Sequence, residues 1–336
     1  MIPLADIQTT SDWQTQLRNA IGSGEELLSL LQLTPENAGF SLAASKDFAL
    51  KVPHSFAARM RQGDPNDPLL RQVLSHDLET LPTPGYGHDP VGETGDANTH
   101  PGIIQKYEGR ALLILAGACA INCRYCFRRH FPYNENRNSR QQWTDAQAHI
   151  AADPSITEII LSGGDPLLVT DRQLAALVEQ LADIPHLKRL RVHSRMPIVL
   201  PARVTDGLVR ALTASRLQAV MVVHSNHGNE VNAEVRQALQ RMTEANIPLL
   251  NQAVLLAGIN DSVTALADLS ESLFSAGVLP YYLHLLDKVQ GAAHFDVAKQ
   301  RGIALIMELE RRLPGYLVPR LVHEQAGEPA KVRIFA

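Results

Sequence analysis

The sequence contains little cysteine, few aromatic residues and no long apolar run. Cysteine occupies three of its 336 positions, and aromatic side chains account for 5%. So few thiols, and an odd number of them, exclude a framework of disulfide bridges, which needs paired cysteines and an oxidising compartment. The longest aliphatic stretches, such as residues 111–117, have the length of a strand and fall far short of the ~18 residues of a membrane-spanning helix. We therefore expect no contact with a membrane.

The charges exclude further classes of function. The formal net charge is −4, so the chain lacks the basic excess that is typical of nucleic-acid-binding proteins. Residues 1–6 have neither the basic nor the apolar part of a secretory signal, and we therefore expect a cytoplasmic protein. Hydrophobic residues make up 45% and charged residues 20%, which is the balance of a globular enzyme with one large domain or two ordinary ones.

The first hundred residues differ in pattern from the rest. Residues 13–33 carry apolar side chains at helical spacing, which predicts a helix there. Residues 81–102 are dense in proline and glycine, which is typical of a long connecting loop. We expect residues 1–100 to form a mainly helical and loop region, and residues 101–336 to form the part that carries the chemistry.

From residue 111 onward, short apolar runs alternate with amphipathic stretches. The predicted strands are 111–117, 158–162, 190–194, 219–224, 249–256 and 280–287. The predicted helices are 171–182, 202–214, 231–245 and 262–276. Crossovers of this length predict a parallel sheet, and six such units favour a partial (β/α)6 barrel of the α/β class. In barrels the catalytic groups lie on the loops that follow the strands.

All three cysteines lie within eight residues, directly after the first predicted strand. Cys119, Cys123 and Cys126 have the spacing C-x3-C-x2-C, which lets three thiolates converge on one iron–sulfur cube. A [4Fe–4S] cluster normally takes four cysteine ligands. The chain holds no fourth cysteine, so one iron is left open for a ligand that is not protein. The alternative is a zinc site with His130 as its fourth ligand, since structural zinc favours cysteine and histidine.

Paired glycines follow the second predicted strand, in the run Leu161-Ser-Gly-Gly-Asp-Pro-Leu167. Such a pair permits close approach of the backbone to a ligand, although an ordinary tight turn has the same composition. Next to the three-cysteine loop, the pair favours a site for the ligand of the open iron. S-adenosylmethionine can chelate that iron through its amino and carboxylate groups. The backbone carbonyls of Gly163 and Gly164 would then bind its amine.

The cysteine and glycine motifs resemble those of the radical S-adenosylmethionine enzymes, and longer strings narrow the resemblance. The strings are Cys123-Arg-Tyr-Cys-Phe-Arg-Arg-His-Phe131, Gly163-Gly-Asp-Pro-Leu167, Asn226-His-Gly-Asn-Glu230 and Asn251-Gln-Ala-Val-Leu-Leu256. In this order they resemble the lysine 2,3-aminomutase family, above all its short bacterial branch that makes (R)-β-lysine for elongation factor P. The resemblance runs from about residue 55 to the end, and it implies a partial radical-SAM barrel with a short C-terminal extension.

The resemblance implies a second cofactor, pyridoxal 5′-phosphate. Lys331, in the run Ala326-Gly-Glu-Pro-Ala-Lys331, matches the lysine that forms the Schiff base in this family. Lys106, Tyr107 and Arg110 match its phosphate site, just before the first predicted strand. The family usually has arginine at the position of Lys106, and a lysine binds phosphate as a point charge without a bidentate fork. Without the resemblance, these residues would be read as ordinary surface or flanking side chains.

The resemblance also assigns the two ends of the substrate. Arg128 matches the residue that binds the amino-acid carboxylate, and Asp287 matches an aspartate that binds the lysine ε-ammonium. A second aspartate of the family is replaced by Glu324, whose carboxylate reaches one methylene further. Two carboxylates select a cationic side chain and disfavour glutamate as substrate. Asp165 and His224 are placed near S-adenosylmethionine, although a histidine in an apolar strand is more often a hydrogen-bonded structural residue.

The resemblance implies a radical isomerase that converts L-α-lysine to (R)-β-lysine for the modification of elongation factor P. Its partners would be a reductant such as flavodoxin or ferredoxin, elongation factor P, and the ligase that transfers the lysyl group. One alternative is a free-standing 2,3-aminomutase for lysine or another amino acid; its longer members carry further cysteines and a zinc site after the position of Ala336. A non-catalytic iron–sulfur or zinc protein is the alternative of another class, but it leaves Lys331, Arg128 and Asp287 without a common purpose.

Overall fold

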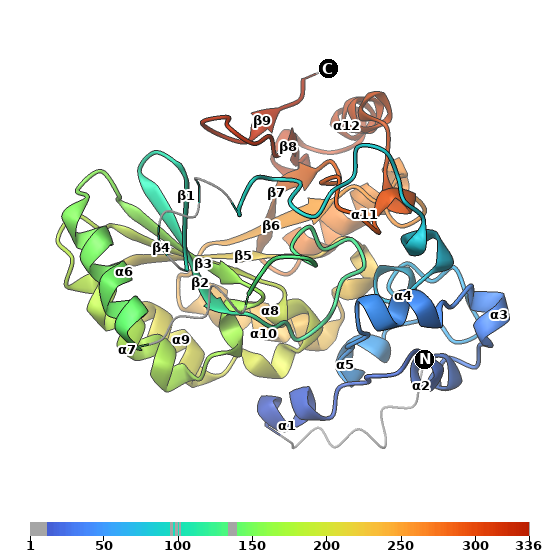
Figure 1. Cartoon of the computed structure of the whole chain (residues 1–336), viewed down its shortest axis with the longest axis horizontal. Helices are drawn as coiled ribbons and strands as arrows, with labels where there is room; N and C mark the ends of the chain where they lie inside the picture. Colours follow the sequence, from blue (N-terminus) through green and yellow to red (C-terminus); the bar gives the residue numbers. More distant parts are fainter. Residues whose placement is uncertain (1–11, 95–96, 98–99, 101, 134–139, 336) are drawn as a thin grey trace.

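The computed structural model describes residues 12–94, 97, 100, 102–133 and 140–335, and its central feature is one nine-stranded sheet (Figure 1). The strands, in chain order, are β1 (Ile103–Tyr107), β2 (Arg110–Ala116), β3 (Glu158–Gly163), β4 (Arg189–Ser194), β5 (Gln218–Val223), β6 (Leu249–Val254), β7 (Val278–His284), β8 (Arg320–His323) and β9 (Val332–Arg333). Strands β2 to β8 run parallel to their neighbours, while β1 and β9 pair antiparallel at the two edges. The sheet is open, which confirms the predicted α/β partial barrel.

The six predicted strands correspond to β2 to β7, with ends that differ by three residues or fewer. The sequence pattern does not predict β8 and β9, which are four and two residues long, or β1, whose apolar run is broken by polar side chains. Strand β1 corrects one expectation. Lys106 and Tyr107 lie inside a strand and Arg110 begins the next one, so the predicted phosphate segment is an antiparallel hairpin that belongs to the sheet.

Helices connect the parallel strands, and Figure 1 shows α6, α7 and α9 along one flank of them. They are α6 (Arg140–Ala152), α7 (Asp171–Ala182), α8 (Met196–Val199), α9 (Asp206–Thr213), α10 (Ala233–Glu244), α11 (Val263–Phe274) and α12 (Lys299–Arg312). The four predicted helices correspond to α7, α9, α10 and α11. Each begins at a side chain that accepts a hydrogen bond from the first turn, as Thr170 does at α7 and Ser262 does at α11. Because β2 to β8 run parallel, their carboxyl ends lie together at one end of the barrel.

The N-terminal region consists of short helices (Figure 1). They are α1 (Trp13–Arg18), α2 (Gly24–Leu30), α3 (Pro35–Ala38), α4 (Leu42–Asp47), α5 (His54–Ala57) and the 3-10 turns η2 (Leu70–Gln72) and η3 (Asp77–Thr80). The single helix predicted over residues 13–33 is wrong. Ile21 leaves the helix to exchange two backbone hydrogen bonds with Val52, and Ser23 then caps a second helix.

The segment 81–102 connects the N-terminal helices to β1, as its proline and glycine content predicts, and parts of it lie outside the described residues. Gly87 exchanges two backbone hydrogen bonds with residues 288–290, which follow β7. The Asp89 side chain accepts a hydrogen bond from the backbone N–H of Glu93, which closes a turn. The segment is therefore fastened to the carboxyl end of the sheet, where it can contribute side chains to a site.

One apolar core joins the two parts of the chain. Its members include Trp13 in α1, Phe56 in α5 and Ile334 after β9, so the N-terminal helices pack on the same core as the sheet. The division into domains 1–100 and 101–336 stays a prediction. Among the described residues, no helix is both long and apolar enough to cross a membrane.

Candidate active site

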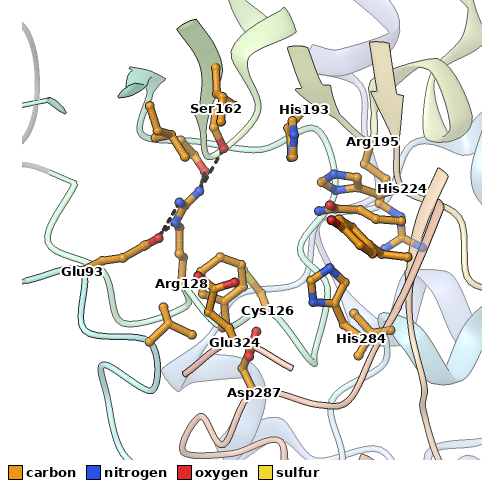
Figure 2. Close-up of a pocket in the computed structure, with 18 of the residues that line it drawn as sticks. Glu93, Cys126, Arg128, Ser162, His193, Arg195, His224, His284, Asp287 and Glu324 are labelled. Carbon is orange, nitrogen blue, oxygen red and sulfur yellow. Dashed lines mark hydrogen bonds and ion pairs between the residues drawn. The ribbon is translucent and has the colours of Figure 1, made fainter. Parts of the chain in front are cut away.

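A cavity of about 390 Å³ lies at the carboxyl ends of the parallel strands (Figure 2). Its walls come from the strand ends, from the turn at Glu93, from the segment between β8 and β9, and from residues 117–128, here named the cysteine loop. It is lined by every site residue predicted from the sequence: Cys119, Cys123, Cys126, Lys106, Tyr107, Arg110, Arg128, Gly163, Gly164, Asp165, His224, Asp287, Glu324 and Lys331. Folding therefore brings the predicted metal, cofactor and substrate residues into one space.

The N-terminal region anchors the cysteine loop through a buried ion pair. Arg124, between two of the cysteines, is fully buried, and its Nε lies 2.9 Å from Glu79 Oε1. Its Nη2 also donates to the carbonyl of Ala44 at 3.1 Å, and Arg129 Nη1 lies 3.0 Å from Glu79 Oε2. A buried ion pair holds its geometry when hydrogen bonds satisfy its remaining donors. Motif reasoning misses this anchor because 45 residues separate the partners.

The three thiols are close enough to affect one another's ionisation. Burial, followed by the charge of Cys123, raises the pKa of Cys126 to about 11. Burial, followed by Cys126, raises the pKa of Cys119 well above its ordinary value. Each buried thiol makes it harder for the others to ionise. A positively charged metal cluster would reverse this effect, because thiols lose their protons when they bind metal. The donor set fits three irons of a [4Fe–4S] cluster.

The alternative fourth ligand, His130, is engaged elsewhere. Its ring stacks on His88 with centroids 4.3 Å apart, and its Nε2 lies 3.3 Å from the carbonyl oxygen of Gln290. Within the described part of the chain, no three His, Cys, Asp or Glu side chains are arranged to hold a single metal ion. A cluster in which each cysteine binds a different iron fits this arrangement better than one zinc ion does.

Gly163 ends β3 beside the end of β2, and Gly164 follows it against the cysteine loop. A Cβ on Gly164 would lie 2.1 Å from the carbonyl oxygen of Ala118, and one on Gly163 would lie 2.6 Å from that of Ala116. Gly163 also has a φ of +119°, which L side chains rarely adopt. The backbone N–H of Gly164 donates to Ala116 O at 2.7 Å. The glycines thus set the position of the cysteine loop, while their contact with S-adenosylmethionine stays a prediction.

Asp165 ties the end of β3 to the end of β4. Its carboxylate accepts hydrogen bonds from Ser194 Oγ at 2.7 Å and from the backbone N–H of Arg195 at 2.9 Å, and burial raises its pKa. The Arg195 side chain reaches the cysteine loop, with Nη1 2.6 Å from Cys123 Sγ and Nη2 3.1 Å from Glu230 Oε2. Arg195 is a site residue that motif reasoning misses, although its position directly after a barrel strand was a usable signal.

Arg128 is buried beside the end of β3, and Figure 2 shows it between Glu93 and Ser162. Its Nε and Nη2 lie 2.6 and 2.9 Å from the two carboxylate oxygens of Glu93. Its Nη1 donates to Ser162 Oγ at 3.0 Å and to the carbonyl of Gly163 at 3.2 Å. Glu93 is the second site residue that motif reasoning misses, because it comes from the connecting loop rather than from a strand end.

Another wall of the cavity, here named the histidine wall, is formed by His193, His224 and His284 (Figure 2). Burial lowers the pKa of His224 to about 3, and it lowers the pKa values of His193 and His284 well below the ordinary value. The Nε2 atoms of all three and Oε1 of Gln252 are buried without a hydrogen-bond partner in the described structure. Buried polar atoms are normally paired, so these atoms are available to hydrogen-bond a ligand in the cavity. The placement of His224 near S-adenosylmethionine stays a prediction.

Lys331 and two carboxylates occupy a further part of the cavity. Lys331 Nζ lies 2.7 Å from Glu324 Oε2, and Glu324 also accepts a hydrogen bond from the Tyr107 hydroxyl. Burial opposes the ionisation of Glu324, but Lys331 and these hydrogen bonds outweigh it and lower its pKa to about 2. At Asp287 burial dominates and raises the pKa to about 7. The two carboxylates, predicted to act together, therefore differ in protonation near neutral pH.

The fold and the site together define a radical S-adenosylmethionine enzyme. An open, mostly parallel barrel carries three cysteines directly after its first parallel strand, and a glycine pair packs on their loop. The sequence model of the Radical SAM superfamily matches residues 113–269, from β2 into α11. Enzymes of this superfamily use a [4Fe–4S] cluster and S-adenosylmethionine.

Curated relatives narrow this class. The L-lysine 2,3-aminomutase of Escherichia coli (strain K12) is 50% identical over 323 residues, which cover 95% of this chain and 93% of that protein. The protein of the same name from Haemophilus influenzae is 47% identical over 325 residues, 97% of this chain and 96% of its own. That of Clostridium subterminale is 34% identical over 326 residues, 96% of this chain and 78% of its own. The chain belongs to the lysine 2,3-aminomutase family of isomerases, whose enzymes also depend on pyridoxal phosphate.

Proposed function

We propose that this enzyme converts L-α-lysine to (R)-β-lysine, and that the product serves the modification of elongation factor P. The observation that carries the proposal is that residues matching the family's metal, cofactor and substrate sites line one cavity, although they are spread from position 106 to position 331. The relatives at 47% and 50% identity are L-lysine 2,3-aminomutases, which supports lysine as the substrate.

The cysteine loop would serve two purposes in this reaction. The cluster with S-adenosylmethionine would supply a radical able to take a hydrogen atom from C3 of the substrate, and pyridoxal phosphate would supply a conjugated system that delocalises the unpaired electron during the shift of nitrogen from C2 to C3. Cys119, Cys123 and Cys126 would hold three irons. Arg128, two residues further along the same loop, would bind the substrate carboxylate and so orient the substrate next to the cluster.

Lys331 is the residue that we propose for covalent attachment of pyridoxal phosphate. Lys331 lines the cavity, and the β1–β2 hairpin contributes Lys106, Tyr107 and Arg110 to the same lining. Arg110 Nε is buried and has no hydrogen-bond partner among the described residues, which fits an anionic group that belongs there. Lys106 would add a point charge to the phosphate site, and Arg110 would add directed N–H groups.

The side-chain end of the substrate would be selected by Asp287 and Glu324. Without substrate, Glu324 is paired with Lys331, whereas the raised pKa of Asp287, about 7, means that its carboxyl group is half protonated at neutral pH. A substrate ε-ammonium next to Asp287 would favour the ionised form and draw off that proton. A glutamate side chain would instead add a third carboxylate to this end of the cavity, which is unfavourable.

The histidine wall supports a cationic substrate in a different way. Because burial keeps all three imidazoles neutral, they add no positive charge that would repel the substrate's ammonium groups. Their unpaired Nε2 atoms offer hydrogen bonds to polar atoms of whatever occupies the cavity. Together with the buried floor of the barrel, they would replace water around the reacting groups.

The proposed destination of the product rests on the resemblance of the sequence motifs to the short bacterial branch that makes (R)-β-lysine for elongation factor P. We propose a cytoplasmic enzyme, because the cluster needs a reducing compartment, with flavodoxin or ferredoxin as reductant. Elongation factor P, the ligase, this enzyme and α-lysine should together give a modified factor whose hydrolysate contains (R)-β-lysine on chiral chromatography. A hydrolysate in which the attached residue is α-lysine alone, although this enzyme is active, would favour a free-standing metabolic aminomutase.

A panel assay tests the reaction itself. The enzyme is reconstituted without oxygen and is given dithionite, S-adenosylmethionine, pyridoxal phosphate and one L-amino acid at a time. We expect a β-amino acid from lysine alone, with R configuration on chiral chromatography, and about four irons per chain. A β-product from another amino acid would overturn the substrate assignment. A stoichiometric zinc ion with no uptake of iron would overturn the reaction class.

A further inference from the structure

The guanidinium of Arg128 has almost no free hydrogen-bonding capacity. An arginine side chain carries five N–H groups in one plane. Two of them, on Nε and Nη2, bind Glu93 at 2.6 and 2.9 Å. Two more, on Nη1, bind Ser162 Oγ at 3.0 Å and the carbonyl of Gly163 at 3.2 Å (Figure 2). A substrate carboxylate needs two parallel N–H groups for bidentate binding, so it has to displace one of these partners.

Glu93 is the partner whose position allows it to leave. Ser162 and Gly163 belong to β3, and the parallel ladder with β2 fixes their backbone. Glu93 instead lies in the loop before β1, in a turn that the Asp89 side chain closes. A change of its side-chain rotamer would release Arg128 without breaking any pair of strands.

The Glu93 carboxylate has a second cation within reach. Burial opposes its ionisation, but Arg128 and Lys106 outweigh burial and lower its pKa, so the group is charged. Lys106 Nζ lies 3.3 Å from Glu93 Oε1. If Glu93 gave up Arg128, it would keep this ion pair, and its charge would not become buried without a partner.

Glu93 also carries the same chemical group as the α-carboxylate of an amino acid. Replacing one by the other on Arg128 preserves the two charge-assisted hydrogen bonds and the pairing of a buried guanidinium. Without Glu93 the free enzyme would hold Arg128 buried and unpaired on that side, which is unfavourable. The observed pair is therefore a suitable resting state for a carboxylate-binding arginine.

We propose that Glu93 occupies the substrate-carboxylate position in the free enzyme and that the substrate binds by exchange. Its α-carboxylate replaces Glu93 on Arg128, and Glu93 keeps its contact with Lys106. The inference rests on the proposed function, because it takes Arg128 as the group that binds the substrate carboxylate. Glu93 then competes with every ligand that carries an α-carboxylate, whereas a ligand without that group leaves Glu93 on Arg128.

The test compares two ligands that differ only at the carboxyl group. L-Lysine and L-lysinamide are titrated by anaerobic calorimetry into the reconstituted holoenzyme without reductant, so that no turnover occurs. Glu93→Gln should bind lysine about tenfold more tightly than the wild type does, because the competing charge is gone, while lysinamide affinity stays unchanged. Glu93→Asp should also bind lysine more tightly than the wild type does, but by a smaller factor than Glu93→Gln. Glu108→Gln, which removes an exposed carboxylate from the β1–β2 turn, is the matched control and should change neither.

The outcomes separate this inference from the proposed function. Unchanged or weakened lysine binding in Glu93→Gln would show that Glu93 holds Arg128 in place instead of yielding to the substrate, and would overturn exchange. If the holoenzyme binds another α-amino acid in place of lysine and Glu93→Gln tightens that binding, exchange is supported and the substrate assignment fails. If no α-amino acid binds to the wild type or to Glu93→Gln, both the exchange and the proposed function fail.

Discussion

The two regions of the cavity obtain their polar groups in different ways. At the cysteine loop, Cys119 to Arg128 span ten consecutive positions, and the glycine pair at the end of β3 packs on Ala116 and Ala118 just before them. At the other region, Lys106 comes from β1, Asp287 from the loop after β7, and Lys331 from the end of the chain. The first region is a local motif on one loop, whereas the second exists only after the whole barrel has formed.

The regions also differ in how their charges are balanced. Each arginine near the cysteine loop is already paired, Arg128 with Glu93 and Arg195 with Glu230. In the other region Glu324 is paired with Lys331, and burial leaves Asp287 with a pKa of about 7. Asp287 is thus the group with the most to gain from a cationic ligand. We infer that the positive charge of the substrate is recognised mainly at Asp287, while the arginine region exchanges one carboxylate for another.

The largest expected effect is that of Lys331→Ala. Loss of the amine removes the only covalent attachment that we assign to pyridoxal phosphate, so the absorbance near ~420 nm of the bound cofactor should disappear, together with all activity. Iron content and cleavage of S-adenosylmethionine should persist, because the cysteine loop lies elsewhere in the cavity. Lys288→Ala, in the loop after β7, is a control that should keep the band. Persistence of the band in Lys331→Ala would refute the assignment.

Asp287→Asn should weaken lysine binding by about a hundredfold, since it removes one partner of a buried charge pair. Norleucine, which lacks the ε-amino group, should bind the wild type and Asp287→Asn with equal affinity. S-adenosylmethionine should also bind the two proteins with equal affinity. Equal losses for lysine and norleucine would show that Asp287 has only a structural role.

The same substitution should stabilise the fold. The pKa of Asp287 is raised from 3.8 to about 7 in the folded protein, so ionisation costs stability as pH rises between these values. Asp287→Asn should therefore raise the free energy of unfolding by a few kcal/mol above pH 7, and this gain should fade as pH falls toward 4. Urea titrations of the enzyme without cofactors at several pH values measure it. A gain that is independent of pH would contradict the raised pKa.

The pH dependence of binding sharpens the contrast between the two carboxylates. Glu324, with a pKa of about 2, stays ionised between pH 5.5 and 8, whereas Asp287 takes up a proton below about 7. The preference for lysine over norleucine should fall by up to about tenfold per pH unit below 7. Both ligands carry an α-amino group, so its titration affects both affinities equally and cancels in their ratio. A flat ratio over this range would locate ammonium recognition at Glu324 alone.

Glu324→Asp should have the smallest effect, because it restores the residue usual in the family and keeps the charge. The shorter side chain has to give up part of its contact with Tyr107 or Lys331, so we expect a change of only a few-fold in the KM for lysine. A loss as large as that of Asp287→Asn would mean that the extra methylene is essential to the geometry of this site.

The contrast between the regions also explains what the sequence can predict. Strands β2 to β7 are predictable because each is a short apolar run buried in a parallel sheet, and the cysteine loop is predictable because its spacing is itself the signal. Lys331 and Glu324 are recognisable only by resemblance, since a charged residue near a chain end has no local signature. Their presence in the cavity depends on β8 and β9, which are too short to predict.

Other residues escape prediction for reasons of sequence distance. Glu93 lies 35 positions before Arg128, and Glu79 lies 45 positions before Arg124, so no local pattern joins the partners. The helix expected over 13–33 fails for a related reason, because Ile21 pairs with Val52, far along the chain. In each case a contact formed by folding overrides, or adds to, what the local pattern indicates.

The radical source and the lysine substrate should share one cavity, and a lysine labelled with deuterium tests whether they do. L-Lysine deuterated at C3 is given to the reconstituted enzyme, and S-adenosylmethionine and β-lysine are then recovered and analysed by mass spectrometry. We expect deuterium in the 5′ position of S-adenosylmethionine and at C2 of β-lysine, because a hydrogen atom leaves C3 for the cofactor and returns at C2. Recovery of β-lysine with no deuterium in S-adenosylmethionine would show that the hydrogen atom does not pass between the substrate and this cofactor.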